Sequence, residues 1–219
     1  MSRIAGVDEA GRGPLAGPVV AAAVVIAPDR RIRGLADSKV LPAERREELF
    51  ALIHARAVAV GVGVVDHLTI DRINILEATR VAMGQALAAL SVAPELIITD
   101  FVALRDCPCP QHNLVDGDAR CASVAAASIV AKVTRDRLMR EVDAQYPEYG
   151  FAKHKGYPVR EHVAALARLG ASPVHRRSFA PVRTVLGLPP LPPWPNAEAV
   201  SENAEEFEEP EPAPGRVSV

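Results

Sequence analysis

The sequence is poor in aromatic side chains, since Phe, Trp and Tyr make up 4% of its 219 residues although 49% are hydrophobic. A core of this composition must be built from Val, Ile, Leu and Ala, which is typical of buried strands in α/β proteins. The N-terminus lacks the charged and then apolar pattern of a signal peptide. The longest apolar run, residues 19–27, is about half of the roughly 18 residues that a membrane span needs. We therefore expect a cytoplasmic protein that does not enter the membrane.

Cysteine is also scarce, with only Cys107, Cys109 and Cys121. An odd number of cysteines argues against a disulfide framework. A structural zinc site needs four ligands, and the Cys-Pro-Cys spacing does not match the usual gap. His112 would complete a set of four, but we interpret the three cysteines as loop thiols in a reducing compartment.

The formal net charge of −2 conceals an uneven distribution of charge. Residues 196–219 contain seven Glu and one Arg, so that residues 1–195 carry a net charge of +4. Residues 151–185 contain seven Lys or Arg against a single Glu. Such a block is usually a solvated face, but beside an acidic cluster it would fit the phosphate backbone of a nucleic acid.

Hydrophobic periodicity indicates a mixed α/β sheet flanked by helices. We expect strands at residues 4–9, 19–26, 57–65 and 95–100, with a brief strand near 113–115. We expect helices at residues 42–56, 74–90, 122–143 and 161–169. Residues 1–188 form the expected folded domain, with a basic helical C-terminal region. Residues 189–219 combine a proline-rich linker with an acidic tail that lacks the apolar content to fold.

Four acidic residues follow expected strands or precede the long helix. Asp8 and Glu9 close the first strand, Asp100 closes the fourth, and Asp118 comes just before the helix. Carboxylates are costly to bury without compensation, and convergent carboxylates are the ligands that Mg²⁺ and Mn²⁺ prefer. Taken singly, Asp100 and Asp118 would be turn or helix caps. Asp8 and Glu9 would also point to opposite strand faces unless the backbone bends there.

A glycine turn, Gly11-Arg12-Gly13, follows the first pair of carboxylates. Two glycines let a backbone approach a ligand closely, so that peptide groups can read a sugar hydroxyl or a phosphate. The same glycines would serve equally well in a tight turn between strands. The pattern lacks the Gly-Lys-Ser/Thr ending of a P-loop and differs from the dinucleotide fingerprint in spacing and context.

The segment IAGVDEAGRGPLAGPV, residues 4–19, resembles the opening signature of bacterial ribonuclease HII, a type 2 ribonuclease H. Further segments resemble the later blocks of that family in the same order: residues 37–39, 126–136, 149–151, 154–157 and 175–179. The resemblance covers about residues 3–188. It implies an α/β ribonuclease H-like fold, with a mixed central sheet flanked by helices.

The resemblance implies a catalytic site for two Mg²⁺ or Mn²⁺ ions, held by Asp8, Glu9, Asp100 and Asp118. Asp118 is preferred to Asp116 and Asp136, because the family's fourth carboxylate follows a glycine shortly before the helix. We expect Asp136 instead to pair with a neighbouring Arg or Lys.

The resemblance also implies how substrate is bound. Gly11, Arg12 and Gly13 would sense the ribose 2′-OH through backbone groups, and Tyr157 would pack against the next sugar. Candidate phosphate contacts are Lys39, Lys155, Arg176 and Arg177. Without the resemblance, each of these would be an ordinary turn, tyrosine or surface cation.

The implied reaction is hydrolysis on the 5′ side of a ribonucleotide, which leaves 3′-hydroxyl and 5′-phosphate ends. The implied partners are RNA/DNA hybrids and duplex DNA with an embedded ribonucleotide, bound by a monomer that serves DNA repair. Three roles are open to the acidic tail: a solubilising appendage, a protein-binding segment, or a mimic of nucleic acid.

Three other interpretations compete with this one. The related ribonuclease HIII has an extra N-terminal domain and a Gly-Lys-Gly turn, whereas here the carboxylate pair falls at residues 8 and 9 and the turn is Gly-Arg-Gly. A non-catalytic nucleic-acid-binding module would use the basic region alone, with the carboxylates as caps. A scaffold protein acting through the tail would explain nothing upstream of it.

Overall fold

A computed structural model describes residues 3–36, 38–100, 102–105, 107–114, 117 and 121–192. The chain divides into two units, Met1–Pro189 and Pro190–Val219. The expected acidic tail, Asp37 and Asp118 lie outside the described residues. Among the helices that are described, none has both the length and the apolar character needed to cross a membrane.

The first unit contains all the described helices and strands. In chain order they are β1 (Ile4–Ala10), β2 (Val19–Val25), α1 (Ala43–Arg56), β3 (Ala59–Val65), α2 (His67–Ile73), α3 (Ile75–Ala88), β4 (Leu96–Asp100), β5 (Gln111–Leu114), α5 (Ala122–Gln145), the 3-10 turn η1 (Pro147–Tyr149), α6 (Phe151–His154), α7 (Arg160–Leu169) and α8 (Ala180–Val185).

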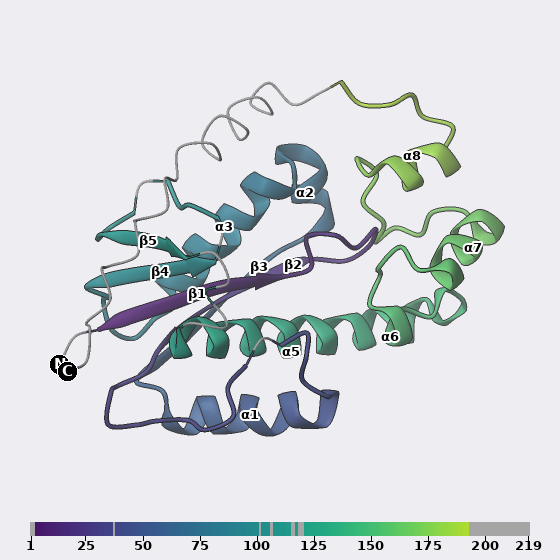
Figure 1. The fold of residues 1–219 in the computed structure, drawn as a ribbon. Coiled ribbons are helices and arrows are strands. Elements are labelled where there is room, and N and C mark those ends of the chain that lie inside the picture. The colour runs from purple at the N-terminus through teal and green to yellow at the C-terminus, as the bar shows by residue number, and fades with distance from the viewer. Residues whose placement is uncertain are drawn as a thin grey trace, which may run out of the picture. The chain divides into compact units, whose positions relative to one another are not determined.

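The strands form one mixed sheet in the order β3-β2-β1-β4-β5, with β1 at its centre (Figure 1). β2 runs antiparallel to both β1 and β3, whereas β4 lies parallel to β1 and β5 lies parallel to β4. The expected mixed sheet flanked by helices is therefore confirmed.

Helices cover both faces of the sheet, with α2 and α3 on one side and α1 and α5 on the other (Figure 1). Side chains alternate between the faces along each strand. Val7 and Ala23 pack with α3, while Ala22 and Val24 pack with α1 and α5. The β-branched and alanine-rich strands thus build two thin aliphatic cores that need almost no aromatic side chains.

Helix α5 packs unusually close to β1 at Gly6. A Cβ atom on Gly6 would lie 2.1 Å from the backbone carbon of Ser123 and 2.2 Å from the backbone nitrogen of Val124. Gly6 therefore lets the backbones of helix and strand approach each other. The small residues at the start of α5 are buried against the sheet.

Three differences from the expected elements have local causes. α2 was not expected, because seven residues are too few for a helical period to show; Asp66 caps this helix by accepting the N–H of Thr69 at 2.8 Å. Asn74, at φ 67°, separates α2 from α3 and caps α3 through the N–H of Glu77 at 3.0 Å. The short strand β5 begins at Gln111, two residues before the expected start, because it pairs with β4 from Ile97 onward.

We predict that Gly6→Ala destabilises the protein by about 2–3 kcal/mol, because its methyl group would meet helix backbone that cannot move aside. The matched control is Gly84→Ala in α3, where nothing lies within 4 Å of the added Cβ. This control should be neutral or stabilising by up to about 1 kcal/mol. Urea denaturation measures both changes, and equal stability of the two variants would contradict the close-packing argument.

Candidate active site

Asp8, two residues before the end of β1, lies beside Asp100, the last residue of the neighbouring strand β4. β1 and β4 are parallel, with Val7 paired to Thr99, so Asp8 and Asp100 occupy the next matching positions. Matching residues of parallel strands point to the same face. The two carboxylates therefore lie on the face that α5 covers, as expected for groups that act together.

Asp8 is buried, with 8% of its surface exposed. Burial raises the pKa of Asp8 to about 8, and the neighbouring charges of Glu9 and Asp100 add to this shift. Its Oδ1 accepts the backbone N–H of Glu9 at 2.8 Å, and the Ser128 hydroxyl of α5 bonds its side chain. Ser128 in turn lies 2.9 Å from the hydroxyl of the buried Ser38. These hydroxyls link Asp8 to α5 and to the loop before α1.

Glu9 is the member of the acidic cluster (Asp8, Glu9 and Asp100) that contacts the glycine turn. Its Oε1 is 3.3 Å from Nη1 of Arg12, which forms an ion pair with it. Burial raises the pKa of Glu9, and Asp100 adds to the rise, while Arg12 and Lys39 oppose it. Its Oε2 is buried and has no hydrogen-bond partner among the residues that the structure describes. A buried carboxylate oxygen without a donor is costly, and a cation would supply what it lacks.

The residue before Asp118 lies beside Asp100. The backbone N–H of Gly117 donates to Oδ1 of Asp100 at 3.3 Å, and a Cβ on Gly117 would lie 3.7 Å from the Asp100 Cα. Asp136, the rejected alternative, forms a structural ion pair with Lys132 at 2.7 Å, and Nη2 of Arg46 lies 3.9 Å from it. The expected pairing of Asp136 is confirmed.

The acidic cluster fits a hard divalent cation. Asp8, Glu9 and Asp100 repel one another, burial raises the pKa of both Asp8 and Glu9, and among the described residues Oε2 of Glu9 has no hydrogen-bond partner. Oxygen-only ligands of this kind suit Mg²⁺ or Mn²⁺. Within the described residues, no three His, Cys, Asp or Glu side chains are grouped closely enough to hold a metal by themselves.

The glycine turn is shaped by close contacts. Gly11 adopts φ 99°, which L side chains rarely adopt, and a Cβ there would lie 2.0 Å from Nε of Arg135. Gly13 faces Tyr157, whose Cε1 would lie 3.8 Å from an added Cβ. Tyr157 is 37% exposed, with the Lys132 ammonium 5.8 Å from its ring centroid. An exposed aromatic ring thus borders the turn beside a cation.

Three buried histidines, His154, His162 and His175, support the loop that carries Tyr157. Nδ1 of His162 lies 2.9 Å from the Tyr157 carbonyl oxygen, and its Nε2 lies 3.1 Å from Nε2 of His175. Nδ1 of His154 accepts the Gly156 N–H at 3.2 Å. Burial lowers the pKa of His175 to about 4 and also lowers that of His162, so both are neutral at pH 7.

The four expected phosphate contacts lie in different environments. Lys39 is exposed and close enough to Glu9 to lower its pKa. Arg177 is exposed, while the Lys155 ammonium is half-buried and donates to the Ala152 carbonyl. Arg176 differs from the expectation, because it is fully buried. It donates to backbone carbonyls of the glycine loop, which is the connection between β1 and β2 (residues 11–18) and begins with the glycine turn. A guanidinium so placed does not face a phosphate.

Sequence reasoning missed three polar residues near the site: Ser38, Ser128 and Lys132. Ser128 interrupts a run of alanines in α5, and a hydroxyl in an otherwise apolar stripe is a signal that could have been used. Lys132 lies one turn further along the same helix and approaches Tyr157. Nothing local to Ser38 indicates its bond to Ser128, because the two are 90 residues apart.

Comparison with known proteins agrees with this arrangement. Residues 5–182 match the model of the family described as Ribonuclease HII. Ribonuclease HII of Geobacillus kaustophilus is 60% identical over 184 residues, which cover 84% of this chain and 70% of that protein.

Two solved structures share the fold. Ribonuclease H2 from Pyrococcus horikoshii gives a TM-score of 0.72 at 29% identity, over 84% of this chain and 96% of the other. Ribonuclease HII from Archaeoglobus fulgidus, solved in a complex with PCNA, gives 0.69 at 26% identity, over 83% and 96%. The expected ribonuclease H-like fold is confirmed. This chain belongs to the bacterial ribonuclease HII family and is an endonuclease of the type 2 ribonuclease H class.

Proposed function

We propose that this ribonuclease H hydrolyses the phosphodiester on the 5′ side of a ribonucleotide and leaves 3′-hydroxyl and 5′-phosphate ends. Its substrates are RNA/DNA hybrids and duplex DNA with a single embedded ribonucleotide, from which it removes the ribonucleotide. One observation carries the proposal: the Glu9–Arg12 ion pair at 3.3 Å joins a buried acidic cluster directly to a glycine turn. The chemistry of cleavage and the reading of a sugar would therefore meet at one place.

The acidic residues would hold two Mg²⁺ or Mn²⁺ ions, with Asp8, Glu9, Asp100 and Asp118 as ligands. Such ions activate the attacking water and stabilise the leaving 3′ oxygen. Asp8 must be ionised to act as a ligand, and Ser128 favours that state by bonding its side chain. The position of Gly117 beside Asp100 supports Asp118 as the fourth ligand.

The glycine turn would read the substrate. A 2′-hydroxyl distinguishes RNA from DNA at a single nucleotide, and the peptide groups of Gly11, Arg12 and Gly13 would sense it. Tyr157 offers its exposed ring to the following sugar. Lys39, Lys155 and Arg177 would contact phosphates.

The proposal extends to the domain organisation, the cellular location, the oligomeric state and the partners of the chain. We propose that residues 1–188 act as the catalytic domain of a cytoplasmic monomer. The Archaeoglobus relative was solved with PCNA, and a protein partner for residues 196–219 would be an analogous arrangement. The non-catalytic binding module and the scaffold are set aside, because the family to which the chain belongs is one of enzymes.

The direct test uses a DNA duplex that contains one ribonucleotide, incubated with Mg²⁺ or Mn²⁺ and separately with a chelator. We expect a single nick just 5′ of the ribonucleotide, dependent on the metal, because one 2′-hydroxyl is enough for the turn to read. Gel analysis of end-labelled strands locates the nick and identifies its ends. Cleavage confined to long RNA/DNA hybrids would contradict the reading of a single ribonucleotide.

We predict that Asp8→Asn abolishes cleavage yet stabilises the metal-free protein by roughly 1–3 kcal/mol. The raised pKa of Asp8 means that the unfolded chain loses this proton near pH 4 and the folded protein near pH 8. The stability of the metal-free wild type therefore falls as pH rises between these values. The gain from Asn should be larger at pH 8 than at pH 5.

Thermal unfolding in a chelator measures this difference, with Asp66→Asn as the control because Asp66 is an exposed helix cap. Mg²⁺ should raise the Tm of the wild type and of the control more than that of Asp8→Asn. If Asp8→Asn had a lower Tm than the wild type at pH 8 without metal, this result would contradict the raised pKa of Asp8.

A second pair of variants tests the fourth ligand. Asp118→Asn should lower kcat/KM by on the order of 100-fold or more while the fold is retained. Asp136→Asn breaks the ion pair with Lys132 and should lower stability by about 1–3 kcal/mol, with little change in kcat/KM. Steady-state kinetics and thermal unfolding separate the two, and the reverse pattern would make Asp136 the ligand.

A further inference from the structure

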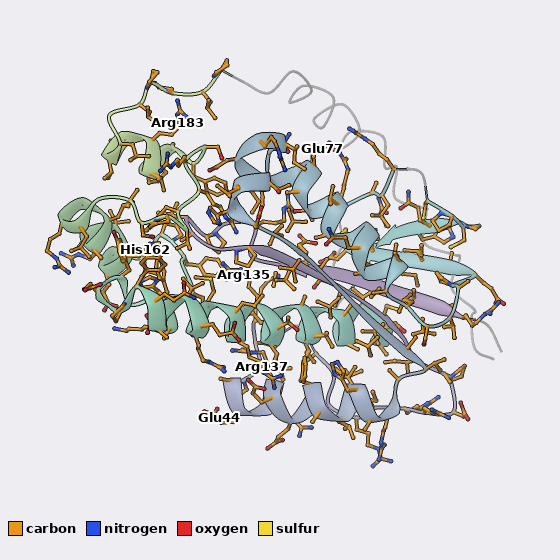
Figure 2. All side chains as sticks on the ribbon, turned by 180° about the vertical axis from the view of Figure 1, so that it is seen from behind. Glu44, Glu77, Arg135, Arg137, His162 and Arg183 are labelled. Atoms are coloured by element: carbon orange, nitrogen blue, oxygen red, sulfur yellow. The ribbon has the colours of Figure 1, made fainter. Side chains whose placement is uncertain are left out.

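Among the described residues, Arg135 and Arg176 are the two largest fully buried side chains, each with 0% of its surface exposed. Figure 2 shows Arg135 directed from α5 toward the sheet, whereas Arg137 of the same helix is directed toward α1. Burying a guanidinium is costly unless its donors are satisfied. In the described part of the chain, the hydrogen bonds of both guanidiniums go to backbone carbonyl oxygens.

Arg176 holds the two ends of the glycine loop. Its Nη2 donates to Gly11 O at 2.7 Å and to Pro18 O at 3.1 Å. Its Nη1 donates to Arg12 O at 3.0 Å, and its Nε donates to Gly17 O at 2.9 Å. One planar fork therefore fixes four peptide groups, which a lysine ammonium with three donors could not match in number or geometry.

The orientation of the turn follows from these bonds. In a trans peptide the C=O and the following N–H point in opposite directions. Because the carbonyls of Gly11 and Arg12 point inward at Arg176, the N–H groups of Arg12 and Gly13 point away from it. The buried guanidinium thus turns two peptide donors outward.

Arg135 joins this loop to the loop that carries Tyr157. Its Nε donates to Pro18 O at 2.9 Å and its Nη2 to Ala16 O at 3.2 Å, while its Nη1 donates to Lys155 O at 3.0 Å. Its guanidinium carbon also lies 5.8 Å from the Tyr157 ring centroid. Together with the backbone hydrogen bond from the Leu15 N–H to the Gly156 carbonyl at 2.7 Å, this side chain fixes the spacing between the two loops.

The two cations are placed close together despite their mutual repulsion. Burial, and after it the charge of Arg135, lowers the pKa of Arg176 to about 9, and burial lowers the pKa of Arg135 to about 10, so both remain charged at neutral pH. Two like charges buried close together lower the stability of the fold. Residues that carry such a cost are expected at functional sites, which favours a role for this pair in shaping the site.

Resting on the proposed function, we infer that Arg135 and Arg176 are positioning residues for ribonucleotide recognition. They aim the N–H groups of the glycine turn outward and fix the gap between that turn and Tyr157. Neither touches the substrate. Their loss should therefore weaken the preference for a 2′-hydroxyl more than the binding of a duplex.

The test compares two duplexes that differ by one 2′-hydroxyl, in a chelator so that no cleavage occurs. The variants are Arg176→Lys and Arg135→Lys, which keep the charge and lose the fork. The control is Arg140→Lys, an exposed arginine of the same helix that pairs with Glu47. Fluorescence anisotropy gives the ratio of the two dissociation constants for each protein.

The wild type and Arg140→Lys should prefer the ribonucleotide duplex by about tenfold, as expected for one hydrogen bond. Arg176→Lys and Arg135→Lys should reduce this preference to within about twofold of unity, with the affinity for all-DNA duplex nearly unchanged. Partial unfolding lowers both affinities by the same factor, so the ratio reports positioning and not stability.

An unchanged ratio in both variants, or no preference in the wild type, would overturn the inference. Failure of both variants to fold, judged by circular dichroism, would also overturn it, because the pair would then be a folding requirement. The wild type is assayed in parallel for the Mg²⁺-dependent nick. Absence of that nick refutes the proposed function, whereas a nick with unchanged ratios refutes the inference alone.

Discussion

The close approach of α5 to β1 is the constraint on which the rest of the structure depends. Gly6 removes the side chain that would keep them apart. The helix then brings Ser128 to Asp8 and, two turns later, Arg135 to the glycine loop. One strand and one helix therefore carry two of the acidic residues, Asp8 and Glu9, and Arg135, one of the two arginines that support the turn. A protein with these functional residues but a wider gap at this contact would hold the same groups too far apart.

Two opposite solutions to buried charge lie next to each other in this site. The carboxylates Asp8 and Glu9 are buried with incomplete compensation, so their pKa values rise, and in the described part of the chain one Glu9 oxygen has no donor. The guanidiniums Arg135 and Arg176 are buried with their donors satisfied by carbonyl dipoles. A bound cation would supply the charge and the oxygen partner that the two carboxylates lack. The second is complete within the protein, and so it can hold backbone in place whether or not substrate is bound.

Sequence reasoning predicted the parts of the fold that rest on local pattern. The strands β1 and β3 and the long α5 show their periodicity over enough residues to be recognised, and Asp8 and Asp100 stand out because a carboxylate ends an apolar strand. The depth of Arg176 could not be predicted, because a buried arginine and a surface arginine look alike in a basic segment. Its partners are carbonyls about 160 residues away, which no side-chain pattern encodes.

The matched register of β1 and β4 makes some positions in the chain far less tolerant of change in length than others. Because strand side chains alternate, insertion of one residue within β4 would turn Asp100 to the face opposite Asp8. The connection between β4 and β5, which includes Cys107 and Cys109, has no strand register to keep, although Val102 and Leu104 within it are buried. Homologous chains can therefore be expected to vary in length and composition between these two strands while the strands themselves keep their residue count.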